Sequence, residues 1–219
     1  MIRLSIDTKA TIKIGPYSRG GYNRHGATAA DHDFEPEAII KLFGIFIPQI
    51  DENHFYFTSS NVTADFMVDA LQDLWPRIKQ QVDPHTSVIN ADNGPENSSH
   101  RTQFIKRIVE FAQSKKIDVS LAYYPPYHSK YNPVERVWGV LEKHWNGQLL
   151  DSIDKVIGLA KTMKWKGKNP FVKIVDGIYE TGVRLTKSAM KKYENMLERK
   201  AELEKWFVDV FCFNQQRFN

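Results

Sequence analysis

The first residues of the chain alternate between apolar and polar side chains. Ile2, Leu4 and Ile6 fall on one side of this period-two pattern, and Asp7 falls on the other. Such alternation is typical of a β-strand with one buried face. We therefore expect a strand from residue 2 that carries Asp7 near its end, on the face opposite the apolar side chains.

Two apolar runs follow, and a short polar segment separates them. Residues 39–50 and 54–58 flank the polar residues 51–53. Two runs joined by so short a connection predict an antiparallel hairpin. Before the hairpin, residues 14–38 are rich in Gly, Asn, His and Asp. We expect this segment to be a long irregular insertion.

Three helices and two more strands are predicted after the hairpin. Apolar residues recur at three- and four-residue intervals, the pattern of an amphipathic helix, in residues 66–78, 104–112 and 134–145. Short apolar runs that predict strands separate these helices, at residues 87–91 and 119–123. Asn61 or Thr63 is placed to cap the first helix, and Pro133 suits the first turn of the third.

This order of elements predicts an α/β fold, with a mixed sheet and helices packed on its faces. We expect residues 1–150 to form the core of the fold. Residues 151–219 are predicted to form a helical, basic extension packed on that core. Its last long helix is expected to run from about Thr186 to Trp206.

Composition restricts the class of protein. A chain of 219 residues with 42% hydrophobic residues can bury one substantial core. The only cysteine, Cys212, excludes a disulfide framework and is expected to be buried as a small apolar residue. The sequence shows neither an apolar run long enough to span a bilayer nor a signal peptide, so we expect a cytoplasmic protein without a membrane partner.

The charge is distributed unevenly. Residues 161–200 carry 11 Lys and Arg against 4 Asp and Glu, whereas residues 1–160 carry 17 against 19. A basic segment suits a surface that faces a polyanion, and it equally suits a solvated helix. Charge alone therefore identifies no partner.

Three acidic residues are candidates for catalysis. Asp7 lies near the end of the first predicted strand, and Asp92 stands where a strand gives way to an Asn-Gly-Pro turn. Glu135 opens a predicted helix, and the spacing Asn132-x-x-Glu135 also fits a capping box. Each residue alone has an ordinary structural explanation; the argument for chemistry is the set of three on successive elements.

Three carboxylates brought together repel one another unless cations neutralise them. Oxygen ligands without clustered Cys or His favour Mg²⁺ or Mn²⁺ over zinc or copper. Two such ions can hold the attacking and leaving oxygens of a phosphodiester in an in-line displacement. Asp7, Asp92 and Glu135 therefore point to chemistry on a nucleic-acid backbone.

Three sequence blocks carry a family resemblance. They are LSIDTK around Asp7, INADNG around Asp92, and YPPYHSKYNPVERVW around Glu135. The chain resembles the DDE transposases of bacterial insertion sequences, within them the ISAzo-type group, which is related to the mariner-like transposases. The resemblance covers nearly the whole chain, and the third block is its most specific part.

The resemblance implies an RNase-H-like fold in which Asp7, Asp92 and Glu135 are catalytic and bind two Mg²⁺ (or Mn²⁺) ions. It implies cleavage at the transposon ends and transfer of the freed 3′-hydroxyl into target DNA. The implied partners are DNA, namely terminal inverted repeats and target, and a second copy of the chain in a homodimer on DNA. No small-molecule cofactor is implied, and the expected location is the bacterial nucleoid.

Several basic residues are candidates for binding the DNA backbone. His128 and Lys130 precede the helix of Glu135, and Lys164, Lys166 and Lys168 surround a tryptophan. Cations beside aromatic rings suit a nucleic-acid strand. Ordinary solvated surface is the alternative for both groups.

The sequence also departs from a complete transposase of this kind. Asp7 follows only six residues, so we expect sequence-specific recognition of DNA to come from another segment or chain. The 42 residues between Asp92 and Glu135 exceed the usual interval. Two alternatives remain open: an RNase-H-like nuclease or resolvase without joining activity, and an inactive DNA-binding remnant.

Overall fold

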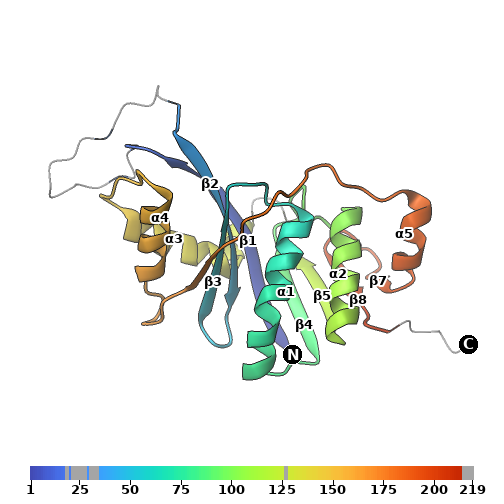
Figure 1. The fold of residues 1–219 in the computed structure, drawn as a ribbon. Helices are drawn as coiled ribbons and strands as arrows, with labels where there is room; N and C mark the ends of the chain where they lie inside the picture. The colour runs from blue at the N-terminus through green and yellow to red at the C-terminus, as the bar shows by residue number, and fades with distance from the viewer. Residues whose placement is uncertain (18–19, 21–28, 30–34, 126–127, 214–219) are drawn as a thin grey trace, which may run out of the picture.

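A mixed eight-stranded sheet forms the centre of the molecule (Figure 1). The structure is a computed structural model that describes residues 1–17, 20, 29, 35–125 and 128–213. Its strands are β1 (Ile2–Ile14), β2 (Ala38–Ile47), β3 (Glu52–Thr58), β4 (Thr86–Ala91), β5 (Asp118–Tyr123), β6 (Phe171–Ile174), β7 (Leu197–Arg199) and β8 (Phe207–Val210). Its helices are α1 (Ala64–Gln81), α2 (Thr102–Lys115), the 3-10 turn η1 (Ser129–Tyr131), α3 (Pro133–Trp145), α4 (Ile153–Thr162) and α5 (Lys187–Glu194).

The strand order is β6-β3-β2-β1-β4-β5-β8-β7. Strands β1, β2 and β3 pair antiparallel, and β4 and β5 continue the sheet parallel to β1. Strand β6 pairs parallel with β3, and β8 pairs antiparallel with β5. The long strand β1 therefore lies in the middle, with a hairpin on one side and helix-connected strands on the other.

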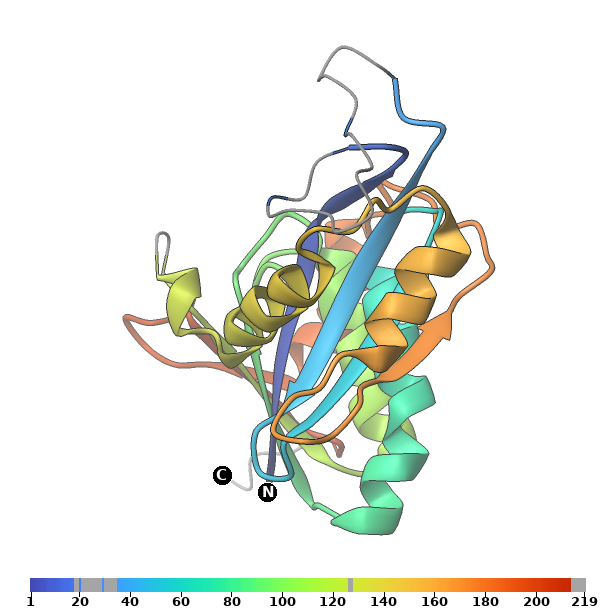
Figure 2. The same ribbon diagram turned by 90° about the vertical axis from the view of Figure 1, so that its left-hand side faces the viewer.

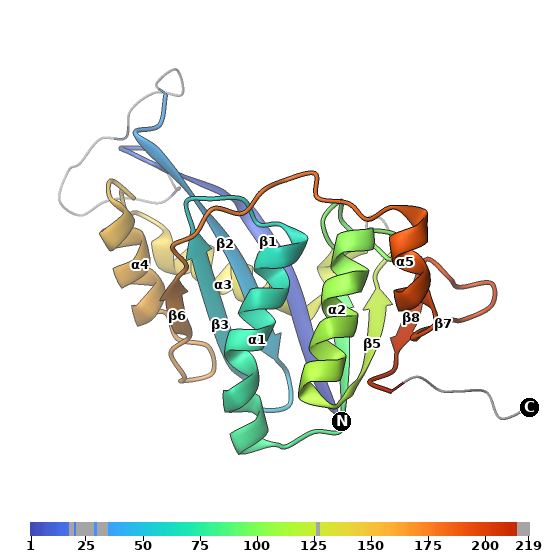
Figure 3. The ribbon, with the colours of Figure 1, turned by 45° about the vertical axis from the view of Figure 1, so that its right-hand side comes forward.

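Helices cover both faces of the sheet. Helices α1 and α2 lie on one face (Figure 3), and their apolar side chains pack with Ile2, Leu4 and Ile6 of β1. Helices α3 and α4 cover the other face over β1, β2 and β3 (Figure 2), where Leu42 and Phe55 join their core. The predicted α/β fold with a mixed sheet is confirmed.

Most predicted elements in the first 150 residues are present. The hairpin, the three helices and the two intervening strands occupy the expected segments. Thr63 caps α1, because its hydroxyl accepts a hydrogen bond from the Phe66 amide at 3.4 Å. The predicted insertion begins after Ile14, the last residue of β1, and most of it lies outside the described residues.

The expectation of a long helix from Thr186 to Trp206 is wrong. Helix α5 ends at Glu194, and the chain then forms β7 and β8. Val208 and Val210 are fully buried in β8, at the two-residue spacing of a strand. Pairing with β5 outweighs the helical propensity of the charged residues before them.

Two further predictions concern the burial of Cys212 and the absence of a membrane-spanning segment. Cys212 is half-exposed rather than buried, and its amide donates to Asp118 at 3.0 Å. The expectation of a buried cysteine is wrong because the chain leaves the sheet after Val210. In the part of the chain that the structure describes, no helix combines the length and apolar character needed to cross a membrane.

Candidate active site

Asp7 lies on the side of β1 that faces α3. Desolvation by burial raises the pKa of Asp7 from 3.8 to about 7, and the charges of Glu135 and Asp92 add to this rise. The hydrogen bond from Trp138 acts in the opposite direction. Strand β1 and helix α3 thus hold a carboxylate where water stabilises its charge poorly, and two other acids lie close enough to perturb it.

Trp138 reaches Asp7 by crossing a glycine. Its Nε1 donates a hydrogen bond to Oδ2 of Asp7 at 2.7 Å, and only 5% of the residue is exposed. Asp7 is paired with Gly44 of β2. A Cβ atom built on Gly44 would lie 2.2 Å from Cη2 of Trp138. The indole therefore occupies the space that any other residue at position 44 would fill.

The amino-terminal end of α3 is anchored to β1 by buried polar groups. Asn132 donates through Nδ2 to the Ile6 carbonyl at 2.9 Å and accepts a hydrogen bond from the Ser5 hydroxyl. The Ser5 oxygen in turn accepts the Val134 amide at 2.9 Å. The Asn132 side chain makes no cap hydrogen bond within α3. The capping-box alternative is wrong, because this side chain binds the sheet instead.

Asp92 directly follows β4 and is exposed. Its Oδ1 accepts hydrogen bonds from the Gly94 amide at 3.2 Å and from Nδ2 of the buried Asn97 at 2.9 Å. Asn93, between Asp92 and Gly94, adopts a left-handed backbone conformation with φ of 61°. Asparagine tolerates this conformation better than most residues. The turn therefore fixes the carboxylate of Asp92 at the end of its strand.

Glu135 lies half-buried in the first turn of α3. Burial raises its pKa, the positive charge of Lys9 lowers it, and the charge of Asp92 raises it. Lys9 forms an ion pair with Glu142 at 2.6 Å, and its ammonium lies 5.9 Å from the Trp138 ring centroid. Lys9 is a site residue that the sequence reading missed, although it lies two residues from Asp7 on the same strand.

The charges of Glu135 and Asp92 raise the pKa of Asp7, and the charge of Asp92 raises the pKa of Glu135, without forming a finished metal site. Among the described residues, no three His, Cys, Asp or Glu side chains are arranged to hold a metal ion. Their chemistry nevertheless fits Mg²⁺ or Mn²⁺, because all the candidate ligands are carboxylate oxygens. Asp7, desolvated and close to two other acids, is the group whose charge a cation would stabilise most.

A sequence comparison identifies the family. The sequence profile of the Rhodopirellula transposase DDE domain matches residues 2–212. The chain belongs to this family. The predicted membership of the DDE transposases is thereby confirmed. No curated protein matches the chain.

Solved structures agree with this assignment at the level of the fold. The transposase domain resembles the Mos1 transposase paired-end complex with the left transposon end, and the Mos1 mariner paired-end complex with Mn. In both cases the TM-score is 0.52 and the sequence identity is 14%. The match covers 70% of this chain and 45% of the Mos1 chain. The domain thus spans less than half of the Mos1 chain. The predicted RNase-H-like fold is confirmed.

A second polar network of the transposase domain joins three strands. Arg3 donates through Nε to Oδ1 of Asn90 and through Nη2 to the Tyr124 hydroxyl at 3.0 Å. These residues belong to or adjoin β1, β4 and β5. Arg3 lies on the same side of β1 as Ser5 and Asp7. The sequence reading missed this network because its members are far apart along the chain.

The basic residues that the sequence predicts to bind DNA lie in two groups. His128 stacks on Tyr131 with ring centroids 5.8 Å apart, and the Lys130 ammonium lies 5.3 Å from the same ring. This group lies in the loop that leads into α3 and is exposed. It therefore adjoins the element that carries Glu135, and its predicted role in DNA binding stays a prediction.

The other basic group lies at the β2–β3 turn. Lys166 pairs with Asp51 at 3.0 Å, and Lys168 donates to the Ile50 carbonyl at 2.7 Å. Lys164, two residues before Lys166 in the sequence, is exposed to solvent. The β2–β3 turn lies beside the amino-terminal end of β1, because Phe46 near the end of β2 already pairs with Ser5. The structure thus places these lysines away from Asp7, and their contact with DNA also stays a prediction.

Replacing Gly44 by alanine should destabilise the domain. The added methyl would collide with Trp138, and overpacking of this kind costs about 1–3 kcal/mol. Urea unfolding would measure the difference. The matched control is Gly139→Ala in α3, where nothing lies within 4 Å of the added Cβ and alanine favours the helix. Equal losses in the two variants would contradict the packing argument.

The raised pKa of Asp7 predicts how the stability of the metal-free protein varies with pH. The folded protein retains a proton on Asp7 between its ordinary pKa of 3.8 and about 7. The resulting stabilisation is complete below that range and is lost as the pH rises through 7. Asp7→Asn should therefore be more stable than the wild type at about pH 8, with the advantage shrinking toward about pH 5.

Chemical denaturation in a chelator, repeated across this pH range, would measure the effect. The exposed Asp176→Asn provides the matched control, since it makes the same chemical change outside the site. If the Asp7→Asn advantage is independent of pH, burial does not perturb Asp7 in the way described.

Proposed function

We propose that this DDE transposase domain cuts and joins phosphodiester bonds of DNA with Asp7, Asp92 and Glu135 as its catalytic residues. The observation that carries the proposal is the electrostatic coupling of these carboxylates, which come from β1, the end of β4 and the start of α3. Acidic groups whose pKa is raised by burial and by neighbouring acids, as for Asp7 and Glu135, are a common sign of function.

The DDE transposase family uses divalent metal ions, and one of the similar Mos1 structures is named as a complex with Mn. We propose two Mg²⁺ or Mn²⁺ ions for this domain. When bound, such ions activate a water and stabilise charge on the reacting phosphodiester. In our assignment Asp7, Asp92 and Glu135 would hold these ions through their carboxylate oxygens.

The surrounding residues prepare the carboxylates for this role. Trp138 holds Oδ2 of Asp7, and Asn97 holds Oδ1 of Asp92. Each bond fixes the direction of a carboxylate, so that its other oxygen can be presented to a cation. Glu135 has more conformational freedom as a long side chain, and we propose that it moves toward the two aspartates when ions bind.

DNA is the proposed substrate and partner. The names of the similar Mos1 structures describe transposon-end complexes. We propose that this domain acts on terminal repeats and target DNA as a homodimer on DNA, with His128 and Lys130 beside the strand that is cut. Residues 1–150 contain all three carboxylates, and we propose that residues 151–219 support them and extend the basic surface.

Substitution of each carboxylate tests the assignment. Asp7→Asn, Asp92→Asn and Glu135→Gln should each lower Mn²⁺-dependent nicking of plasmid DNA by at least about a hundredfold. Circular dichroism would verify the fold of each variant, and Asp176→Asn would serve as the control. Substantial nicking by any one variant would remove that residue from the proposed site.

A joining assay separates transposition from simple cleavage. Precleaved DNA ends with a free 3′-hydroxyl are incubated with plasmid, Mn²⁺ and the wild-type protein. We expect covalently joined product, which the three substitutions abolish. Cleavage without joined product would favour a nuclease, and the absence of both would favour an inactive remnant.

A further inference from the structure

Arg3 carries a positive charge on the α3 side of the sheet without a carboxylate beside it. Its Nε and Nη2 donate to the Asn90 amide oxygen and the Tyr124 hydroxyl, which are both uncharged acceptors. Among the described residues, no Asp or Glu side chain forms an ion pair with Arg3. The residue is also partly buried. Because proteins rarely bury a charge without a counter-ion, this guanidinium indicates an anion that binds from outside.

The two acceptors hold the guanidinium in a fixed direction. Asn90 is buried, and its amide nitrogen donates to the Ala122 carbonyl at 3.4 Å, so its oxygen is turned toward Arg3. The Nη1 hydrogens of Arg3 have no partner among the described residues. The Tyr124 hydroxyl accepts from Arg3 and keeps its own hydrogen for donation. Several donors held together in this way suit the oxygens of a phosphate.

This group of Arg3, Asn90 and Tyr124 lies next to the candidate catalytic carboxylates. Asn90 pairs with Ser5, and Asp92 and Asp7 each follow two positions later on their strands. Tyr124 directly follows β5, as Asp92 directly follows the neighbouring strand β4. Two positions along a strand span roughly 7 Å. The guanidinium held by Asn90 is therefore about one pleat from the level of the carboxylates.

The sheet is open beside Arg3. In the described part of the chain, the core beneath α3 and α4 takes its strand residues from β1, β2 and β3, with Val172 of β6 at its edge. On the same side of the sheet, β4 and β5 present Val88, Ser120 and Ala122, which are small and partly exposed. A nucleic-acid strand that reaches the carboxylates thus has room to continue across β4 and β5 past Arg3.

We propose that Arg3, together with the Tyr124 hydroxyl, binds a backbone phosphate of the DNA strand that lies at the carboxylates. The inference rests on the proposed function, which supplies DNA as the anion. Phosphates of one strand follow at about 3.4 Å along the helix axis. The contacted phosphate is therefore roughly two nucleotides from the reacting one. A contact to the backbone positions the DNA without reading its sequence.

The salt dependence of DNA binding tests this contact. Anisotropy of a short labelled duplex is measured in a chelator, so that neither metal binding nor cleavage enters, at several salt concentrations. Each phosphate contact releases a counter-ion and adds about 0.9 to the slope of log affinity against log salt. Arg3→Gln should lower this slope by about one unit and weaken binding severalfold at low salt.

Three further variants separate a phosphate contact from a structural tie between strands. Arg3→Lys keeps the charge and should keep the slope, with weaker binding because the planar fork is lost. Tyr124→Phe should also weaken binding without changing the slope, since it removes a neutral donor. The matched control is Arg77→Gln on α1, which covers the opposite face of the sheet. Its slope and affinity should equal those of the wild type.

Plasmid nicking in Mn²⁺ separates this inference from the proposed function. Arg3→Gln should raise KM at least about fivefold and leave kcat within about twofold, because a contact away from the reacting bond stabilises ground state and transition state alike. Nicking by the wild type with an unchanged slope in Arg3→Gln would overturn the inference and leave the catalytic proposal standing. A reduced slope in Arg3→Gln without any nicking by the wild type would do the reverse.

A readout in the wild type decides the matter if Arg3→Gln does not fold. The Nε–H signal of Arg3 in nitrogen-correlated NMR spectra is assigned by its loss in Arg3→Lys and followed as duplex DNA is added. We expect a saturable shift that is weakened by salt. No shift of this signal, or a wild type that does not bind DNA at low salt, would overturn the inference.

Discussion

The attachment of α3 to β1 is the constraint on which the candidate active site depends. Asn132 and Ser5 tie the first turn of the helix to the strand through buried hydrogen bonds. One turn later, Trp138 passes over Gly44 to reach Asp7. These contacts fix both the height and the rotation of α3 on the sheet. Glu135 lies between Asn132 and Trp138 in sequence, so its position in the first turn of α3 follows from the same attachment.

This attachment also creates the unfavourable electrostatics of the site. Packing α3 over β1 desolvates Asp7, and desolvation is the largest cause of its raised pKa. The hydrogen bond from Trp138 offsets only part of that effect. Lys9 reduces the negative charge near Glu135 but is itself paired with Glu142. The fold therefore keeps a local excess of negative charge, which a divalent cation would relieve.

The sequence predicts those features that local patterns encode, and it fails where contacts are distant. Alternation placed Asp7 opposite Ile6, and helical periodicity with Thr63 located α1. The bond between Trp138 and Asp7 joins residues 131 positions apart, and no local pattern reveals that Gly44 makes room for it. The strand β8 escaped prediction for the same reason, since its partner β5 is remote along the chain.

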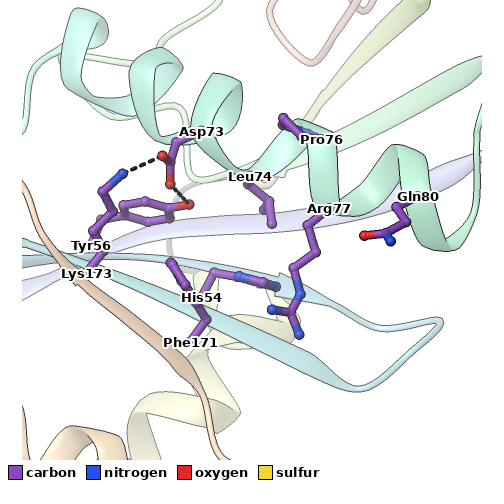
Figure 4. Close-up of a pocket in the computed structure, with 9 residues that line it drawn as sticks. All are labelled: His54, Tyr56, Asp73, Leu74, Pro76, Arg77, Gln80, Phe171 and Lys173. Carbon is purple, nitrogen blue, oxygen red and sulfur yellow. Dashed lines mark hydrogen bonds and ion pairs between the residues drawn. The ribbon is translucent and has the colours of Figure 1, made fainter.

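The two faces of the sheet carry features from different parts of the chain. The three carboxylates all come from the first 150 residues, and each lies in one of the three sequence blocks. A cavity of about 640 Å³ on the α1 face (Figure 4) needs β6, because Phe171 and Lys173 form one of its walls. Strand β6 pairs only with β3 within the described sheet. A change in β6 can therefore alter the cavity while β1 and α3, and with them the carboxylates, remain in place.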